Sequence, residues 1–220
     1  MNELLFFGHI LLVVAFSLGA LRLGSQGLTT LVALQAVLAN LFVVKQMTLF
    51  GLNVTCSDVF AIGSLLALNL LQEFFGREAA EAAIKVSFLS MVFFALMSQV
   101  HLAYIPSGAD GTHDAFLRIF SSTPRIVLAS MAVYYVVQQI DVRLFGFLRE
   151  QWVGVPLSLR VGFTLLFSQT LDTVLFSFFG LGGIVTSLFD IILMSLVVKW
   201  IAIGCSAPFT AFAKKIARTA

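Results

Sequence analysis

The sequence predicts an all-α fold: a polytopic bundle of about seven transmembrane helices that forms a single membrane domain over residues 1–220. Hydrophobic residues make up 60% of the chain and charged residues only 11%, whereas a soluble domain carries about 25% charged residues. The apolar residues form successive continuous runs of about 20 residues, the length that crosses a bilayer as a helix. Short loops join these runs, without a linker rich in Pro, Ser or charge, which indicates one domain.

Each predicted helix is an apolar run, and turn-forming residues separate most of the runs. The first run, residues 3–21, begins at Glu3 and has no basic n-region of a signal peptide, so we expect it to remain as a transmembrane helix. The other predicted helices cover residues 28–50, 57–75, 82–105, 124–148, 157–179 and 184–205. Strands of a transmembrane barrel would be about ten residues long with alternating polarity, so the runs predict helices only.

The positions of the basic residues predict that the N-terminus lies outside the cell and the C-terminus inside. In that orientation Arg118 and Arg125 lie outside. Most other basic residues then lie at the cytoplasmic side: Arg22, Arg77, Lys85, Arg143, Arg149, Arg160, Lys214, Lys215 and Arg218. An odd number of helices agrees with this N-out, C-in arrangement.

Several classes of function have no signal in the sequence. The net charge is only +2 and the Lys and Arg residues are dispersed, which argues against a nucleic-acid partner. The three histidines form no HExxH or other metal-ligand motif, and no Walker A loop, Rossmann fingerprint or nucleophile elbow occurs. We therefore expect no metal, no cofactor, no ATP-driven engine within this chain and no enzymatic activity.

Polar and charged residues inside the predicted helices are the candidates for function, because a charge at the bilayer centre costs about 2.5–3.5 kcal/mol and is retained where it faces protein or water. Several pairs are spaced so that both side chains project from one helix face: Asn69 and Glu73, Gln138 and Asp141, and Gln169 and Asp172. Three helices that each present an amide and a carboxylate toward a common interior would form a pocket rich in acceptors. Such a pocket suits a neutral or cationic small molecule with several N–H groups.

Some of these charged residues also have a structural interpretation. Lys45 is expected to extend its ammonium to the membrane interface. Asp58 is equally well explained as a helix N-cap or as a ligand contact. Glu73 and Asp141 either serve the pocket or pair with the arginines four and two residues further on, Arg77 and Arg143.

Asp172 is the residue whose position most favours a function. It lies in the run FSQTLDTVLFSFF, which has no basic residue, and it could bind a ligand or relay a proton. Lys199 could offset its charge, although the predicted helix register places the two residues at different depths.

Three stretches together resemble the queuosine precursor transporter family, also called the VUT or YhhQ family. They are LNLLQEFFGREAAEAAI (68–84), QQIDVRLFGFLRE (138–150) and RVGFTLLFSQTLDTVLFSFF (160–179). The matching positions are Asn69, Glu73, Phe75, Gly76 and Arg77, then Gln138, Gln139 and Asp141, then Ser168, Gln169, Asp172 and Thr173, and finally Lys199. The resemblance covers about residues 40–215 and implies a six-helix core to which the first helix is an addition. Cys205 and Ser206 stand where many relatives carry Asp-Thr before Pro208.

The resemblance implies a multi-pass protein of the bacterial inner (plasma) membrane that imports 7-deazaguanine precursors of queuosine for tRNA modification. These are 7-cyano-7-deazaguanine, 7-aminomethyl-7-deazaguanine and the base queuine. A carboxylate accepts the adjacent N–H donors of a guanine-like edge, and an amide donates to its carbonyl. The expected substrate-binding residues are Asp172, Gln169 and Asn69 at the base edge, Gln139 and Asp141 behind them, and Gln138, Asn40 and Glu73.

Three other functions remain open from the sequence. An importer of the same architecture could carry another small vitamin-like metabolite, alone or as the substrate-binding subunit of an ATP-driven complex. A membrane assembly protein could use the polar residues only to hold its helices together. An intramembrane enzyme is the third. The oligomeric state is also open, with a homodimer among the options.

Overall fold

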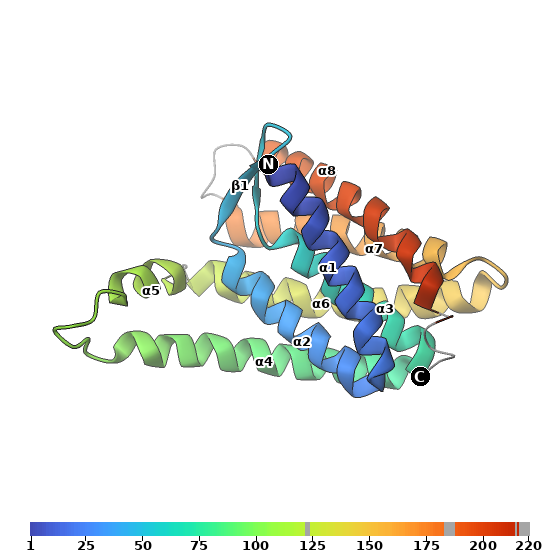
Figure 1. Ribbon diagram of the computed structural model, residues 1–220, viewed down its shortest axis with the longest axis horizontal. Helices are drawn as coiled ribbons and strands as arrows, with labels where there is room; N and C mark the ends of the chain where they lie inside the picture. The colour runs from blue at the N-terminus through green and yellow to red at the C-terminus, as the bar shows by residue number, and fades with distance from the viewer. Residues whose placement is uncertain (122–123, 183–187, 214, 216–220) are drawn as a thin grey trace.

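Seven long helices form a bundle in the computed structural model, which describes residues 1–121, 124–182, 188–213 and 215 (Figure 1). They are α1 (Asn2–Arg22), α2 (Gly24–Phe42), α3 (Asp58–Phe75), α4 (Arg77–Ala103), α6 (Pro124–Gln151), α7 (Leu157–Phe176) and α8 (Leu188–Ser206). The shorter elements are the strands β1 (Gln46–Leu49) and β2 (Leu52–Thr55), helix α5 (His113–Phe120), the π-helical turn η1 (Ser177–Leu181) and the 3₁₀ helix η2 (Ala207–Phe212). The seven predicted segments coincide in order with the seven long helices, so the helical bundle is confirmed.

Within the described residues, six helices are long and apolar enough to cross a membrane. The long helix outside this set is α6, whose 28 residues include Gln138, Gln139 and Asp141. Its length of about 42 Å at 1.5 Å per residue still exceeds the hydrocarbon thickness of about 30 Å. Polar and charged residues lower the mean hydropathy of α6, and two of them, Gln138 and Asp141, are buried in the protein interior.

The prediction of a helix over residues 28–50 was wrong beyond Phe42. Strands β1 and β2 form an antiparallel hairpin in which Gln46 pairs with Thr55 and Leu49 with Leu52. Its two-residue turn, Phe50 and Gly51, has φ of 50° and 80°, the left-handed backbone of a type I′ hairpin turn. The helix ends at Phe42, and the backbone that follows pairs with itself in a hairpin that contacts α1 and α8, with Leu49 and Val54 buried in the core.

The hairpin is attached to the start of α1. The side-chain amide of Asn2 donates to the Thr48 carbonyl at 3.0 Å, and the Phe50 backbone N–H donates to Glu3 at 3.3 Å. Lys45 is exposed in the link between α2 and β1, outside both elements.

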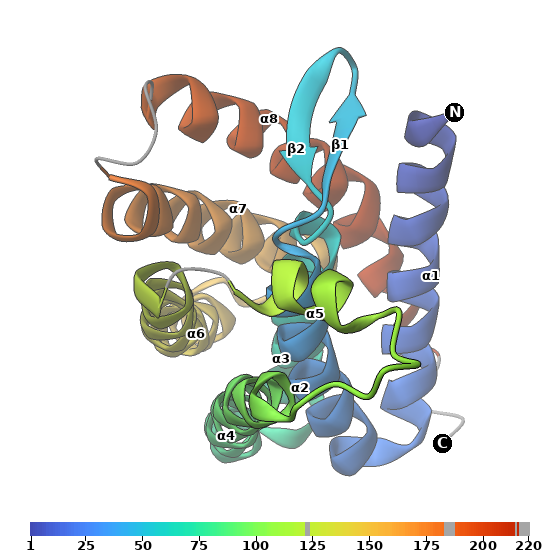
Figure 2. The same cartoon turned by 90° about the vertical axis from the view of Figure 1, so that its left-hand side faces the viewer.

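Helix α3 is the centre of the bundle and contacts each of the other long helices. Figure 2 shows it enclosed, with α1 on one side, α7 and α8 above it, and α4 and α6 on the other side. Small residues such as Gly63 permit this close packing: a Cβ atom there would collide with Gln35 of α2 and Val13 of α1. Most of α3 is therefore buried, including its polar residues Asn69 and Gln72.

Consecutive long helices run in opposite directions, so Met1, the hairpin, α5 and the start of α8 share one end of the bundle (Figure 1). We call it the hairpin end, and the N-out prediction places it outside the cell. At the opposite end, Gly76 has a φ of 89° and turns the chain from α3 directly into α4. Three of the basic residues used to predict the orientation cannot be placed: Lys214, Arg218 and the side chain of Arg125 lie outside the described residues. The predicted start of the last helix, at residue 184, also lies outside them.

Candidate functional site

A polar cavity of about 140 Å³ lies where α2, α3, α6, α7 and α8 meet near the hairpin end. We call it the charged cavity. This volume is below the roughly 300–1,000 Å³ of pockets that hold drug-sized ligands. The cavity therefore suits a molecule smaller than a typical drug. Its polar lining residues are Asn40, Thr55, Ser57, Asp58, Ser130, Tyr134, Asp172, Thr173, Ser177, Ser195 and Lys199.

Three charged side chains from three helices meet at the wall of this cavity. The Lys199 ammonium is 2.9 Å from Asp172 Oδ2 and 3.9 Å from Asp58 Oδ1. The side chains of Lys199 and Asp58 are only 6% and 9% exposed, whereas that of Asp172 is 25% exposed. Two carboxylates thus share one ammonium, which leaves an excess of hydrogen-bond acceptors at the wall.

The expectation that Asp172 and Lys199 lie at different depths was wrong. It relied on helix register alone, but α7 and α8 are tilted relative to each other (Figure 1). The alternative expectation, that Lys199 offsets the charge of Asp172, is confirmed. Asp58 is the first residue of α3, and no side-chain hydrogen bond caps this helix. Of the two interpretations of Asp58, the cap is therefore not realised, and its carboxylate faces Lys199 instead.

A network of hydroxyl and amide groups extends the cavity wall into the bundle. The Tyr134 hydroxyl on α6 is 3.0 Å from the Ser64 hydroxyl of α3 and donates to Ser87 of α4 at 3.3 Å. The Gln138 amide donates to the same Ser64 oxygen at 3.2 Å. Tyr134 lines the cavity and Gln138 does not, so the predicted residue Gln138 is connected to the cavity through Ser64.

Asn40 joins α2 to two other helices at the edge of the cavity. Its amide nitrogen donates to the Ala36 carbonyl at 3.0 Å and lies 3.1 Å from the Met91 sulfur of α4. Its carbonyl oxygen accepts a hydrogen bond from Ser130 of α6 at 3.0 Å. Both polar atoms of this predicted residue therefore have partners.

Further inside, buried polar atoms without a partner cluster on α3, α6 and α7, which contact one another. Buried polar groups are almost always hydrogen-bonded, because an unpaired one costs free energy. Among the described side chains, the exceptions on these three helices include both polar atoms of Asn69, the side-chain carbonyls of Gln138 and Gln169, Asp141 Oδ2 and the Thr173 hydroxyl. We call these five residues the unpaired layer.

Asp141 is held by a neighbouring helix and not by the predicted arginine. Its Oδ1 accepts a hydrogen bond of 2.6 Å from Ser168 of α7, and its side chain is fully buried. Arg143 is exposed, because two residues along a helix turn the side chain to a different face. The proposed pairing of Asp141 with Arg143 was therefore wrong.

Glu73 forms ion pairs at the end of the bundle opposite to the hairpin. Arg160 of α7 donates two hydrogen bonds to its carboxylate, of 3.0 and 2.8 Å, and Arg149 of α6 lies at 3.6 Å. The predicted partner Arg77 instead pairs with Glu81 at 2.7 Å. The reason is the turn at Gly76, which places Arg77 in α4, one helical turn from Glu81.

The predicted site residues thus occupy three regions. Asn40 and Asp172 line the charged cavity; Asn69, Gln138, Asp141 and Gln169 belong to the unpaired layer; and Glu73 lies at the opposite end. Gln139, the remaining predicted residue, is half-buried on α6.

Of the eleven polar residues that line the cavity, only Asn40 and Asp172 belong to the predicted site; the nine that were absent include Asp58, Ser130, Tyr134 and Lys199. A lysine within the apolar run of α8 needs a buried acid nearby, and that requirement was the available signal for Lys199 and Asp58. Hydroxyl residues such as Ser130 and Tyr134 occur throughout apolar helices and gave no such signal. Among the described residues, no group of three or more His, Cys, Asp or Glu side chains could hold a metal ion.

Comparison with known proteins identifies similar sequences. The model of a family described as "Putative vitamin uptake transporter" matches residues 55–213. A protein of Bacillus subtilis (strain 168) named "Probable queuosine precursor transporter" is 29% identical over 211 residues, which cover 94% of this chain and 91% of that protein. No solved structure matches the chain.

Proposed function

Because this chain belongs to the vitamin uptake transporter family, we propose that this membrane transporter imports 7-deazaguanine precursors of queuosine. The substrates would be 7-cyano-7-deazaguanine, 7-aminomethyl-7-deazaguanine or queuine. The name of the Bacillus subtilis relative supports this substrate class, as do the motifs around Asn69, Gln138 and Asp172. The protein would lie in the bacterial inner membrane with its N-terminus outside.

The observation that carries the proposal is the sharing of one ammonium by two carboxylates at the cavity wall. Lys199 contacts one oxygen each of Asp172 and Asp58, and the second oxygen of Asp58 is buried without a hydrogen-bond partner. A guanine-like edge presents a ring N–H and an exocyclic amino group side by side, and a carboxylate can accept from both. A cationic aminomethyl group would also be favoured by the excess negative charge.

The unpaired layer supplies the groups for a second stage of binding. Asn69, Gln138 and Gln169 each have a buried amide carbonyl without a partner, and Asn69 also has an unpaired amide donor. A base that moves inward from the charged cavity would satisfy these groups, so transport would relieve the free-energy cost of leaving them unpaired. In this proposal Asp141, held by Ser168, is the acceptor at the inner side.

Uptake measurements test the proposal. A bacterium that neither makes nor imports queuosine precursors, but retains the downstream enzymes, would express the chain and receive each precursor separately. We expect queuosine to appear in its tRNA. Asp172→Asn and Asp58→Asn should each lower uptake about tenfold or more, because a hydrogen bond to a charged group contributes about 1.5–3 kcal/mol.

Asp114→Asn is the matched control, because Asp114 is exposed on α5 and does not line the charged cavity. If wild-type protein in the membrane restores no queuosine with any precursor, the substrate assignment is wrong. If Asp172→Asn and Asp58→Asn transport as well as Asp114→Asn, the charged cavity is not the binding site.

The family description favours a second candidate, uptake of another vitamin-like metabolite. That function predicts saturable uptake of the metabolite without competition from deazaguanines. Competition by the three precursors against the transported compound distinguishes the two candidates directly.

A further inference from the structure

Two larger cavities lie between the charged cavity and α5, and neither belongs to the site described above. One, of about 560 Å³, lies between the end of α4 and α5; we call it the arm cavity. The other, of about 510 Å³, is lined by α2, α4, α5 and α6 and by Phe176 of α7; we call it the middle cavity. Both are lined largely by apolar and aromatic side chains.

The three cavities are consecutive, because neighbouring cavities share residues. The arm and middle cavities are both lined by Phe94, Ser98 and Phe120. The middle and charged cavities are both lined by Asn40, Val43, Ser130 and Phe176. The three cavities therefore lie one after another between α5 and the paired charges of Asp172 and Lys199, and the side chains that they share separate them.

Side-chain contacts mark both junctions. At the outer junction the rings of Phe94 and Phe120 meet edge to face, with centroids 5.8 Å apart. At the inner junction the hydrogen bond from Ser130 to Asn40 connects α6 to α2. A molecule that moves from one cavity to the next passes each of these contacts, whose rings and hydroxyl can rotate without unfolding a helix.

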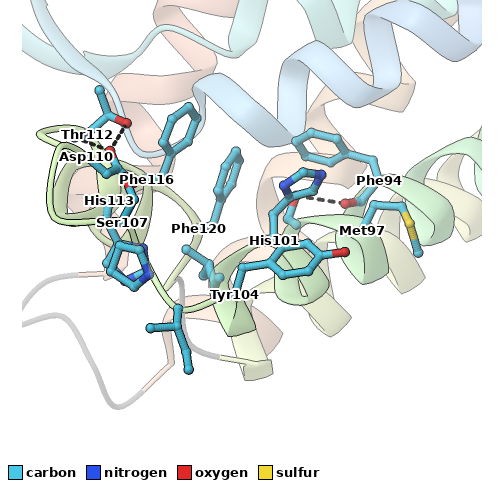
Figure 3. Close-up of a pocket in the computed structure, with 14 residues that line it drawn as sticks. Phe94, Met97, His101, Tyr104, Ser107, Asp110, Thr112, His113, Phe116 and Phe120 are labelled. Carbon is cyan, nitrogen blue, oxygen red and sulfur yellow. Dashed lines mark hydrogen bonds between the residues drawn. The ribbon is translucent and has the colours of Figure 1, made fainter.

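Aromatic rings make up much of the lining of the arm cavity. Figure 3 shows Phe116 and Phe120 of α5 opposite Phe94 and His101 of α4 and Tyr104, the residue that follows α4. The Phe116 and Phe120 rings are stacked, with centroids 5.8 Å apart and planes 18° apart. No residue of α5 is buried, so this helix keeps its rings accessible and does not bury them in a core. Accessible rings of this kind bind flat heteroaromatic molecules by stacking.

We propose that the three cavities form the access route of the transporter and that the arm cavity is the first binding station for a planar heteroaromatic substrate. The inference rests on the proposed transport function and deepens it. The rings of Phe94 and Phe120 hold the substrate at the outer junction, and the Asn40–Ser130 hydrogen bond separates this station from the charged cavity. In this proposal Asn40, whose polar atoms have partners on α2, α4 and α6, lies between two cavities and is not a binding residue.

Kinetics of uptake test the first station. Phe94→Ala and Phe120→Ala should raise the substrate concentration for half-maximal uptake about fivefold or more, the range for loss of one stacking ring, while the maximal rate is retained. Phe94→Tyr, which keeps the ring, should restore the wild-type value. Phe93→Ala is the matched control, because Phe93 is adjacent, 63% exposed and lines none of the three cavities.

Thiol protection provides a second readout that does not depend on the alanine variants. In a Cys56→Ser, Cys205→Ser background, Ser107→Cys lies in the lining of the arm cavity, whereas Ala115→Cys is exposed on α5 outside it. Saturating 7-cyano-7-deazaguanine should slow maleimide modification of Ser107→Cys and leave that of Ala115→Cys unchanged.

The outcomes separate this inference from the proposed function. Wild-type protein that imports no deazaguanine would refute the function itself. Wild-type protein that imports the base, with half-saturation of Phe94→Ala and Phe120→Ala equal to that of Phe93→Ala and no protection at Ser107→Cys, would overturn the route alone. Equal protection at both cysteines would show non-specific adsorption and would also overturn it.

Discussion

Replacing Lys199 with methionine removes the ammonium that faces both Asp172 and Asp58. At distances of 2.9 and 3.9 Å, the gross Coulomb attractions are about 6 and about 4 kcal/mol at an effective dielectric constant of 20. Desolvation cancels much of this attraction, but breaking a buried pair from one side costs about 3–5 kcal/mol. We therefore expect Lys199→Met to lower the free energy of unfolding by about 3–5 kcal/mol.

Asp172→Asn should cost less than Lys199→Met. The Asp172 side chain is 25% exposed, and Lys199 keeps its contact with Asp58. The double variant Lys199→Met/Asp172→Asn should cost less than the sum of the two single changes, because Asp172 no longer leaves an unpaired charge and only Asp58 loses its partner.

Thermal unfolding of the purified protein in detergent measures these effects. For a chain of this size about 1 kcal/mol corresponds to about 2–4 °C, so Lys199→Met should lower the melting temperature by about 6–20 °C. Lys85→Met is the control, because Lys85 is exposed and such changes stay within about 0.5 kcal/mol. If Lys199→Met and Lys85→Met have the same melting temperature, the charges do not form a buried pair. The same conclusion follows if the double variant loses as much stability as the two single variants together.

Three further perturbations address the packing of the bundle, each measured by the same melting assay. Glu73→Gln should lose about 3–5 kcal/mol by breaking a buried ion pair, and Glu81→Gln, in an exposed pair, about 1 kcal/mol or less; equal losses would contradict the burial of Glu73. Gly63→Ala should cost about 1–3 kcal/mol by overpacking against two helices, whereas Gly19→Ala has open space around its Cβ and should be neutral. Ser168→Ala removes the hydrogen bond to a buried carboxylate and should cost about 1–3 kcal/mol; an unchanged melting temperature would argue against that bond.

Apolar run length predicted the helices because the bilayer imposes one length on every crossing segment. The same reasoning failed at residues 43–50, which were predicted as the end of a helix but lead into the hairpin and form its first strand. The turn at Gly51 was expected, whereas the strand before it has too few residues to show an alternating pattern. Helix α5 was also missed, because its eight residues are too few for a crossing segment.

The site was predicted less completely than the fold, because spacing along one helix does not reveal which helices become neighbours. The sequence identified Asp172 as an acid within an apolar helix and Lys199 as a residue that could offset its charge, but the predicted register placed the two at different depths and gave no contact of Lys199 with Asp58. It identified Glu73 as a residue with an arginine partner but named Arg77, since Arg160 is 87 residues away in the chain. Long-range contacts of this kind require the assembled bundle.

The central position of α3 has a consequence for how the protein is made. Gln72 donates to the Val142 carbonyl and Ser64 contacts Tyr134, in each case across 70 residues of chain. At about 5–20 residues per second of synthesis, α3 waits several seconds in the membrane before α6 emerges to pair with these groups. During that interval Gln72 and Ser64 lack their partners on α6, so the polar contacts of the central helix are completed only after more than half of the chain has been made.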